Sequence, residues 1–168
     1  MEPEEHTTHS AGIILIWPYI SLLFDRMELT ENGEFPDAKA QARAVRVLHF
    51  IATREDQPEE DALILEKVLC GLPLATPTEA PEFRKDDLML IESLYEGVIQ
   101  NWPTMQGTSA DAFQQTFLQR QGQVLQNGEQ FRLRVEQGPY DMLLDTLPWN
   151  LSHVKLRWMP APLFVEWR

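Results

Sequence analysis

The apolar residues change their spacing near Gly122, and this change constrains the fold more than any other feature of the chain. Before it they recur at about 3.6 residues, as along one face of a helix. After it they alternate with polar residues, as on a half-buried strand. Helices that come first and strands that come last indicate an α+β fold: a mainly helical domain with a small C-terminal antiparallel β-sheet.

Capping and stop signals divide the first part of the chain into helices. Ser10, Asp37 and Ser109 stand where a side chain can cap a helix N-terminus. Gly71, followed closely by Pro73, is a strong stop signal. The expected helices cover residues 11–29, 38–53, 59–70, 84–102 and 109–120.

The second part of the chain predicts a sheet. Asn127-Gly128 is a dipeptide typical of tight hairpin turns. Because a two-stranded ribbon alone is marginal in water, the hairpin and two later strands are expected to form one antiparallel sheet under the helices, with Trp158 and Trp167 at least partly buried. The expected elements are hairpin strands at 124–126 and 131–135, one or two helical turns at 140–147, and strands at 154–158 and 163–167.

The chain is expected to form one domain. Residues 1–10 are polar and acidic without periodicity, which predicts a flexible tail or a linker stub. Residues 11–168 then form a single α+β domain, since 168 residues with 43% apolar composition can bury a core. The stretch 73–81 is rich in Pro and Thr and is a possible hinge.

Charge and composition exclude several kinds of partner. With 14 basic and 26 acidic residues the net charge is -12, which disfavours nucleic acid and anionic membranes. The longest apolar run, Ala11 to Phe24, contains Pro18 and is shorter than the ~20 residues that span a bilayer. An acidic N-terminus without an export signal and a single cysteine favour a soluble cytoplasmic protein.

No residue pattern predicts catalysis. No two His or Cys residues have metal-ligand spacing, so no metal site and no cofactor are expected, and His6 and His9 are interpreted as solvated. Cys70 lies at a helix C-terminus, where the dipole opposes ionisation, and is expected to be buried. Asp141 and Asp145 are four residues apart and could be paired carboxylates, but a solvated face or a cap is favoured.

Aromatic residues are dense in the last twenty residues, where they either fill the core of a small sheet or form a contact surface. Each tryptophan is expected in the core, yet at least one is expected to face a partner. Arg132 and Arg134 share a strand face and could pair with carboxylates across the sheet, but a solvated strand face is favoured. The candidate interface residues are Trp149, Trp158, Met159, Pro160, Pro162 and Trp167.

The order of motifs from Ala11 to Trp167 resembles the C-terminal region of the tape-measure protein family of phage-tail-like contractile injection systems. Several rare residues in register are more specific than any one motif. The most specific pieces are LCGLP at 69–73, NWP at 101–103, FLQR at 117–120, PYD at 139–141, LPW at 147–149 and the closing WMPAPLFVEW.

The resemblance implies a non-catalytic structural role in assembling the particle, with docking to tube, hub or spike, or baseplate proteins and possible homo-oligomers. It places the protein in the cytoplasm during assembly and then inside the particle. A fully helical chain of 168 residues would span only ~250 Å. The sequence therefore indicates a terminal domain or a short relative, not a long ruler. A cargo adaptor or assembly chaperone is the alternative function, and a hydrolase is a more distant one.

Overall fold

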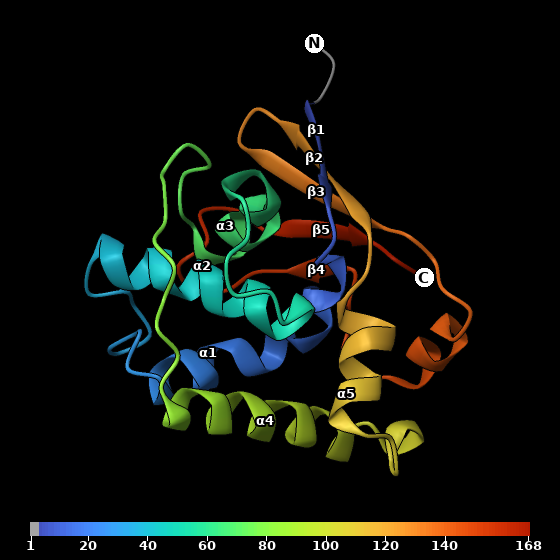
Figure 1. Cartoon of the computed structure of the whole chain (residues 1–168). Helices are drawn as coiled ribbons and strands as arrows, with labels where there is room; N and C mark the ends of the chain where they lie inside the picture. Colours follow the sequence, from blue (N-terminus) through green and yellow to red (C-terminus); the bar gives the residue numbers. More distant parts are fainter. Residues whose placement is uncertain (1–3) are drawn as a thin grey trace.

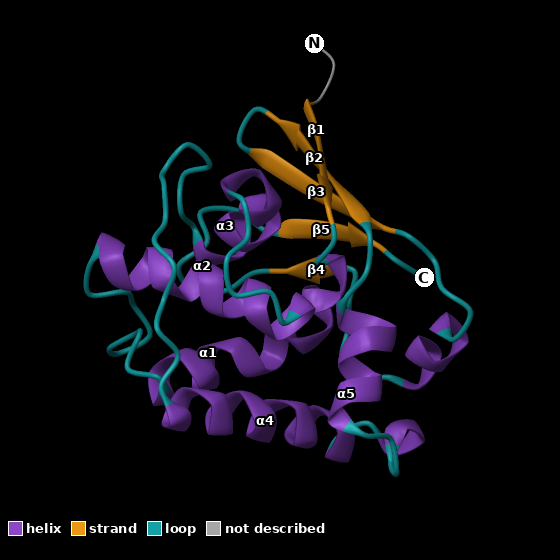
Figure 2. Ribbon diagram, in the orientation of Figure 1, coloured by secondary structure: helices purple, strands orange, loops and turns teal. Residues whose placement is uncertain are grey.

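The computed structural model describes residues 4–168 and shows a mixed five-stranded sheet with helices packed on one face (Figures 1 and 2). This confirms the α+β class. The strand order is β1-β2-β3-β5-β4. The strands are β1 (Glu4–Thr8), β2 (Gly122–Asn127), β3 (Gln130–Val135), β4 (His153–Val154) and β5 (Leu163–Glu166).

The first expected helix is divided into two elements. A 3-10 helix, η1 (Ala11–Ile16), leads into α1 (Trp17–Arg26), so the proline at position 18 lies in the first turn of α1, where no N–H is needed. The expected cap at Ser10 is wrong, because its hydroxyl binds the buried carboxylate of Glu66 instead. All six residues of η1 are buried, and this apolar run forms the centre of the core.

The other helices begin and end close to the expected residues. The Asp37 carboxylate accepts a hydrogen bond from the Ala40 amide at 2.8 Å, and Ser109 caps in the same way. Gly71 ends its helix with a φ of 69°, the left-handed conformation that favours glycine. These elements are α2 (Ala38–Thr53), η2 (Glu60–Leu63), α3 (Ile64–Cys70), α4 (Lys85–Gln100), η3 (Pro103–Met105), α5 (Ala110–Phe113), η4 (Gln114–Leu118, a π-helix) and η5 (Asp141–Thr146).

The hairpin of β2 and β3 is confirmed, with Val124 opposite Leu133. The expectation of a purely antiparallel sheet is wrong, because β5 pairs with β3 in parallel. The connection from β3 to β5 is longer than a dozen residues and contains η5 and β4, which is enough for a crossover between parallel strands. β4 is also shorter than expected and pairs with the far side of β5.

The N-terminal strand β1 was not expected. It pairs antiparallel with β2, with His6 opposite Val124, and in Figure 1 the blue strand lies beside the orange one. The expected flexible tail is therefore wrong for residues 4–8, while residues 1–3 lie outside the described part of the chain. A polar edge strand of this kind is held by backbone hydrogen bonds, which leave no apolar pattern in the sequence.

One face of the sheet carries no helix. Along β3 and β5 the buried residues point to the helices, and the alternate residues are exposed on the other side. We call this second side the open face. Its members on these two strands are Gln130, Arg132, Arg134, Phe164 and Glu166.

Candidate functional site

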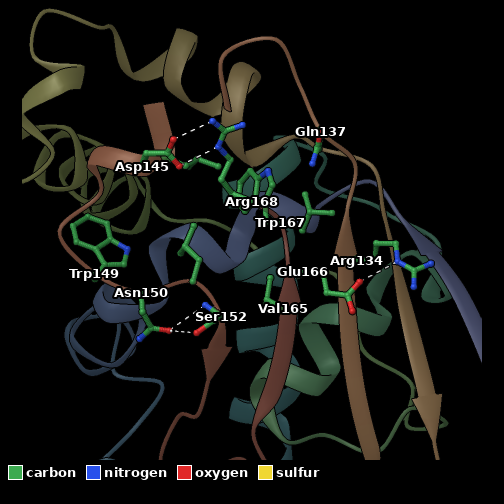
Figure 3. Close-up of a pocket in the computed structure, with 13 residues that line it drawn as sticks. Arg134, Gln137, Asp145, Trp149, Asn150, Ser152, Val165, Glu166, Trp167 and Arg168 are labelled. Carbon is green, nitrogen blue, oxygen red and sulfur yellow. Dashed lines mark hydrogen bonds and ion pairs between the residues drawn. The ribbon is translucent and has the colours of Figure 1, made fainter. Parts of the chain in front are cut away.

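A groove of about 810 Å³ lies where the C-terminal ends of β3 and β5 meet the loop between η5 and β4 (Figure 3). We call it the C-terminal groove. Its walls combine charged, amide and aromatic side chains that come from separate parts of the chain. The lining includes Arg134, Gln137, Asp145, Trp149, Ser152, Glu166, Trp167 and Arg168.

A buried carboxylate fixes the wall of this groove. Asp141 is 2% exposed, and its Oδ2 accepts hydrogen bonds from Arg120 at 2.8 Å and from the Trp167 indole at 2.9 Å. The Gly138 amide donates to the same oxygen at 2.8 Å. Burial alone would raise the pKa of Asp141, but these donors outweigh it and hold the pKa below its usual value. The expectation of a solvated face or cap is wrong for this residue, which joins β5 to the helical body.

Ion pairs form the rim of the groove. The Arg168 guanidinium donates to both carboxylate oxygens of Asp145 at 3.0 Å, and these hydrogen bonds lower the pKa of that carboxyl. Asp145 is exposed, as expected. Across the sheet, Arg132 and Arg134 each donate to Glu166 at 3.2 Å, so these exposed arginines are paired with a carboxylate, the alternative that the strand pattern favoured less. These pairs bring three arginines together with two carboxylates.

Two of the six candidate interface residues line the C-terminal groove. Trp149 is half-buried, and its indole N–H donates to the Leu15 carbonyl at 2.9 Å while its ring meets Tyr19 edge-on at 5.5 Å. Trp167 is 4% exposed, so its side chain belongs to the floor and the core. Its expected burial is confirmed.

The other four candidates lie elsewhere. Trp158 is half-buried, stacks on Phe24 at 5.5 Å and donates its indole N–H to the Leu69 carbonyl at 2.7 Å. Met159 is buried, whereas Pro160 and Pro162 are exposed. The structure thus does not bring the six residues together into one patch.

A buried polar network was missed by the sequence reasoning. His49 and Glu66 are both buried, and the imidazole Nδ1 lies 3.2 Å from the carboxylate Oε1, which also receives the Ser10 hydroxyl. Burial alone would lower the pKa of His49, but Glu66 reverses this, and the net pKa is raised. The helical spacing could have predicted the burial of His49, because it lies one turn from Val45 and Ala52 on the buried face of α2.

Cys70 is fully buried, as expected, and burial raises the pKa of its thiol well above the usual value. Within residues 4–168, no group of three or more His, Cys, Asp or Glu side chains could hold a metal ion. The helices of this same part of the chain lack the combination of length and apolar composition that crossing a membrane requires. Tryptophan and arginine, which are enriched in protein interfaces, both occur in the lining of the C-terminal groove.

The structure thus defines an α+β domain with a groove that is lined by charged, amide and aromatic side chains. The chain belongs to the contractile injection system tape measure protein family, whose model matches residues 1–167. Members of this family form a structural class of protein. No curated protein and no solved structure matches the chain. The resemblance seen in the motifs is confirmed for the family, while its restriction to a C-terminal region stays a prediction.

Proposed function

We propose that this chain is a non-catalytic assembly domain that docks onto the tube, hub or spike proteins of an injection particle through its open face and C-terminal groove. The observation that carries the proposal is the uncovered side of the sheet in a member of a structural family. Docking takes place in the cytoplasm during assembly, and the domain then stays inside the particle.

The composition of this surface supports docking. Phe164 is 45% exposed at the centre of the open face, and the Arg132 guanidinium lies 5.8 Å from its ring centroid. Aromatic and arginine side chains are enriched in protein interfaces, where a few of them carry most of the binding energy. In the C-terminal groove, the indole N–H of Trp149 already donates to the Leu15 carbonyl. A partner can therefore cover the Trp149 ring without leaving a buried donor unpaired.

Replacing Phe164 with aspartate tests the proposal. Phe164→Asp removes the aromatic ring that a partner would bury and adds a carboxylate to the interface, so it is expected to lower incorporation into particles at least tenfold. Met89→Asp is the matched control, because Met89 is 59% exposed on α4, away from the open face. Incorporation is measured by quantitative immunoblotting of purified particles, and folding of both variants by thermal denaturation.

The outcomes separate the candidate functions. Docking through the open face requires that Phe164→Asp be folded yet excluded from particles while Met89→Asp enters normally. Equal incorporation of two folded variants would refute it. Normal particles that lack only a packaged cargo would instead favour the cargo adaptor or chaperone function.

A further inference from the structure

A second groove, of about 730 Å³, lies between α3 and the tip of the β2–β3 hairpin, and we call it the hairpin groove. It is at the opposite end of β3 from the C-terminal groove, because Phe131 lines the former and Arg134 lines the latter. The hairpin groove opens on the helical side of the sheet, where the hairpin extends past α3 (Figure 1). A ligand bound in the hairpin groove would therefore leave the open face free for docking.

The helix-side wall of the hairpin groove is apolar. It is formed by α3, the segment that follows it and the loop before β5. Val68 and Leu72 lie at its base and are almost fully buried, while Leu74 is half-buried higher on the wall. The members of this wall are Ile64, Val68, Leu72, Pro73, Leu74 and Pro160.

The strand-side wall carries two carboxylates beside Phe131 and polar groups. Glu4 lies on β1 opposite Gln126 of β2, and Glu129 lies in the turn of the hairpin. Both glutamates are exposed, and among the described residues neither forms an ion pair with a lysine or arginine. The one lysine of the lining, Lys67, is buried and already paired with Glu60 at 2.8 Å.

The two walls therefore favour a ligand with apolar groups on one side and cationic groups on the other. An apolar side chain would bury surface against Leu72 and Leu74, and a cationic side chain would meet Glu4 and Glu129 across the groove. The seven residues of α3 rise about 10 Å, which matches roughly three residues of extended chain at about 3.3 Å each. The dimensions fit a short segment better than a folded domain.

We propose that the hairpin groove binds a short linear segment of a partner protein that presents leucine-like side chains on one side and lysine or arginine on the other. The net charge of -12 favours the approach of such a segment from a distance. The apolar wall then sets which basic segments are retained, so charge alone does not determine binding.

The test uses the full chain and three labelled peptides, KLKLK, KSKSK and ELELE, with fluorescence anisotropy and 15N chemical shift mapping. In an extended KLKLK peptide the two leucines point to one side and the three lysines to the other. KLKLK is expected to bind saturably, to perturb Leu72, Leu74 and Phe131, and to bind at least fivefold more tightly than either other peptide. Equal binding of KSKSK would mean that only the bulk charge is recognised, and equal binding of ELELE would remove the role of the two glutamates. Either result would overturn the proposal.

Matched variants locate the site. Glu4→Gln combined with Glu129→Gln is expected to weaken KLKLK binding about three- to tenfold. Glu79→Gln combined with Glu82→Gln removes the same charge from exposed residues outside the groove and is expected to leave binding unchanged. Equal effects of the two pairs or absence of KLKLK binding would contradict the proposal. A dimer that KLKLK dissociates would also contradict it, because the groove would then belong to a second copy of the chain.

Discussion

Replacing Gly12 with alanine is expected to destabilise the domain by ~3 kcal/mol or more, at or beyond the upper end of the usual cost of overpacking. Gly12 lies in η1 at the centre of the core, where a Cβ atom would come within 1.7 Å of the Phe117 carbonyl oxygen and 2.7 Å of the Leu118 Cα. Both contacts are with backbone, so no side-chain rotation relieves them. η1 and η4 would have to separate, and the apolar run would lose its packing.

Gly97→Ala is the matched control for this change. Gly97 lies inside α4, and a Cβ there would only reach ordinary contact with the Tyr19 ring at 4.0 Å. Because alanine is a better helix former, this variant is expected to be more stable by ~0.5–1 kcal/mol. Urea unfolding followed by circular dichroism measures both variants. A Gly12→Ala protein with unchanged stability would show that the close approach of η1 and η4 is wrong.

Asp141→Ala is expected to cost ~3–5 kcal/mol, because it leaves the buried Arg120 guanidinium without its carboxylate partner. The Gly138 amide and the Trp167 indole would lose their acceptor at the same time. Asp145→Ala is the control, since that carboxylate is exposed, and its loss is expected to change stability little. The difference between the two variants measures what the buried carboxylate and its three donors contribute beyond an exposed ion pair.

The effect of Asp141 depends on pH in a defined direction. Its pKa in the folded protein lies below the reference value of 3.8, so its ionised form stabilises the fold above that pH. The stabilisation is lost as the pH falls through the lowered pKa. Urea unfolding at pH 7 and at about pH 3 is therefore expected to show a smaller difference between wild type and Asp141→Ala at the lower pH. A difference that grows on acidification would contradict the ion pair.

Local signals in the sequence predicted the helices better than the sheet. Asp37 before α2 and Gly71 after α3 act within one turn, so the pattern that marks them is short. The pairing of β5 with β3 instead depends on the path of the intervening chain, which periodicity does not encode. β1 shows the same limit, since the sequence EEHTT carries no alternation of apolar residues and is held by its neighbour.

The candidate site was predicted only in part. The concentration of tryptophans drew attention to a segment that contributes Trp149 and Trp167 to the lining of the C-terminal groove. Their partners could not be predicted, since Asp141 becomes buried only when Arg120 from the helical part approaches it. For the same reason the network of His49 with Glu66 was missed, although its position on the buried face of α2 was readable.

The most direct test of the account is cryo-electron microscopy of assembled injection particles from cells that carry wild-type or Phe164→Asp protein. Wild-type particles are expected to show density for this domain, with the open face of the sheet and the C-terminal groove against a tube, hub or spike subunit. Particles from cells that carry the variant are expected to lack that density. Wild-type particles in which the domain contacts its neighbours only through α1 and α4, with the open face in solvent, would contradict it.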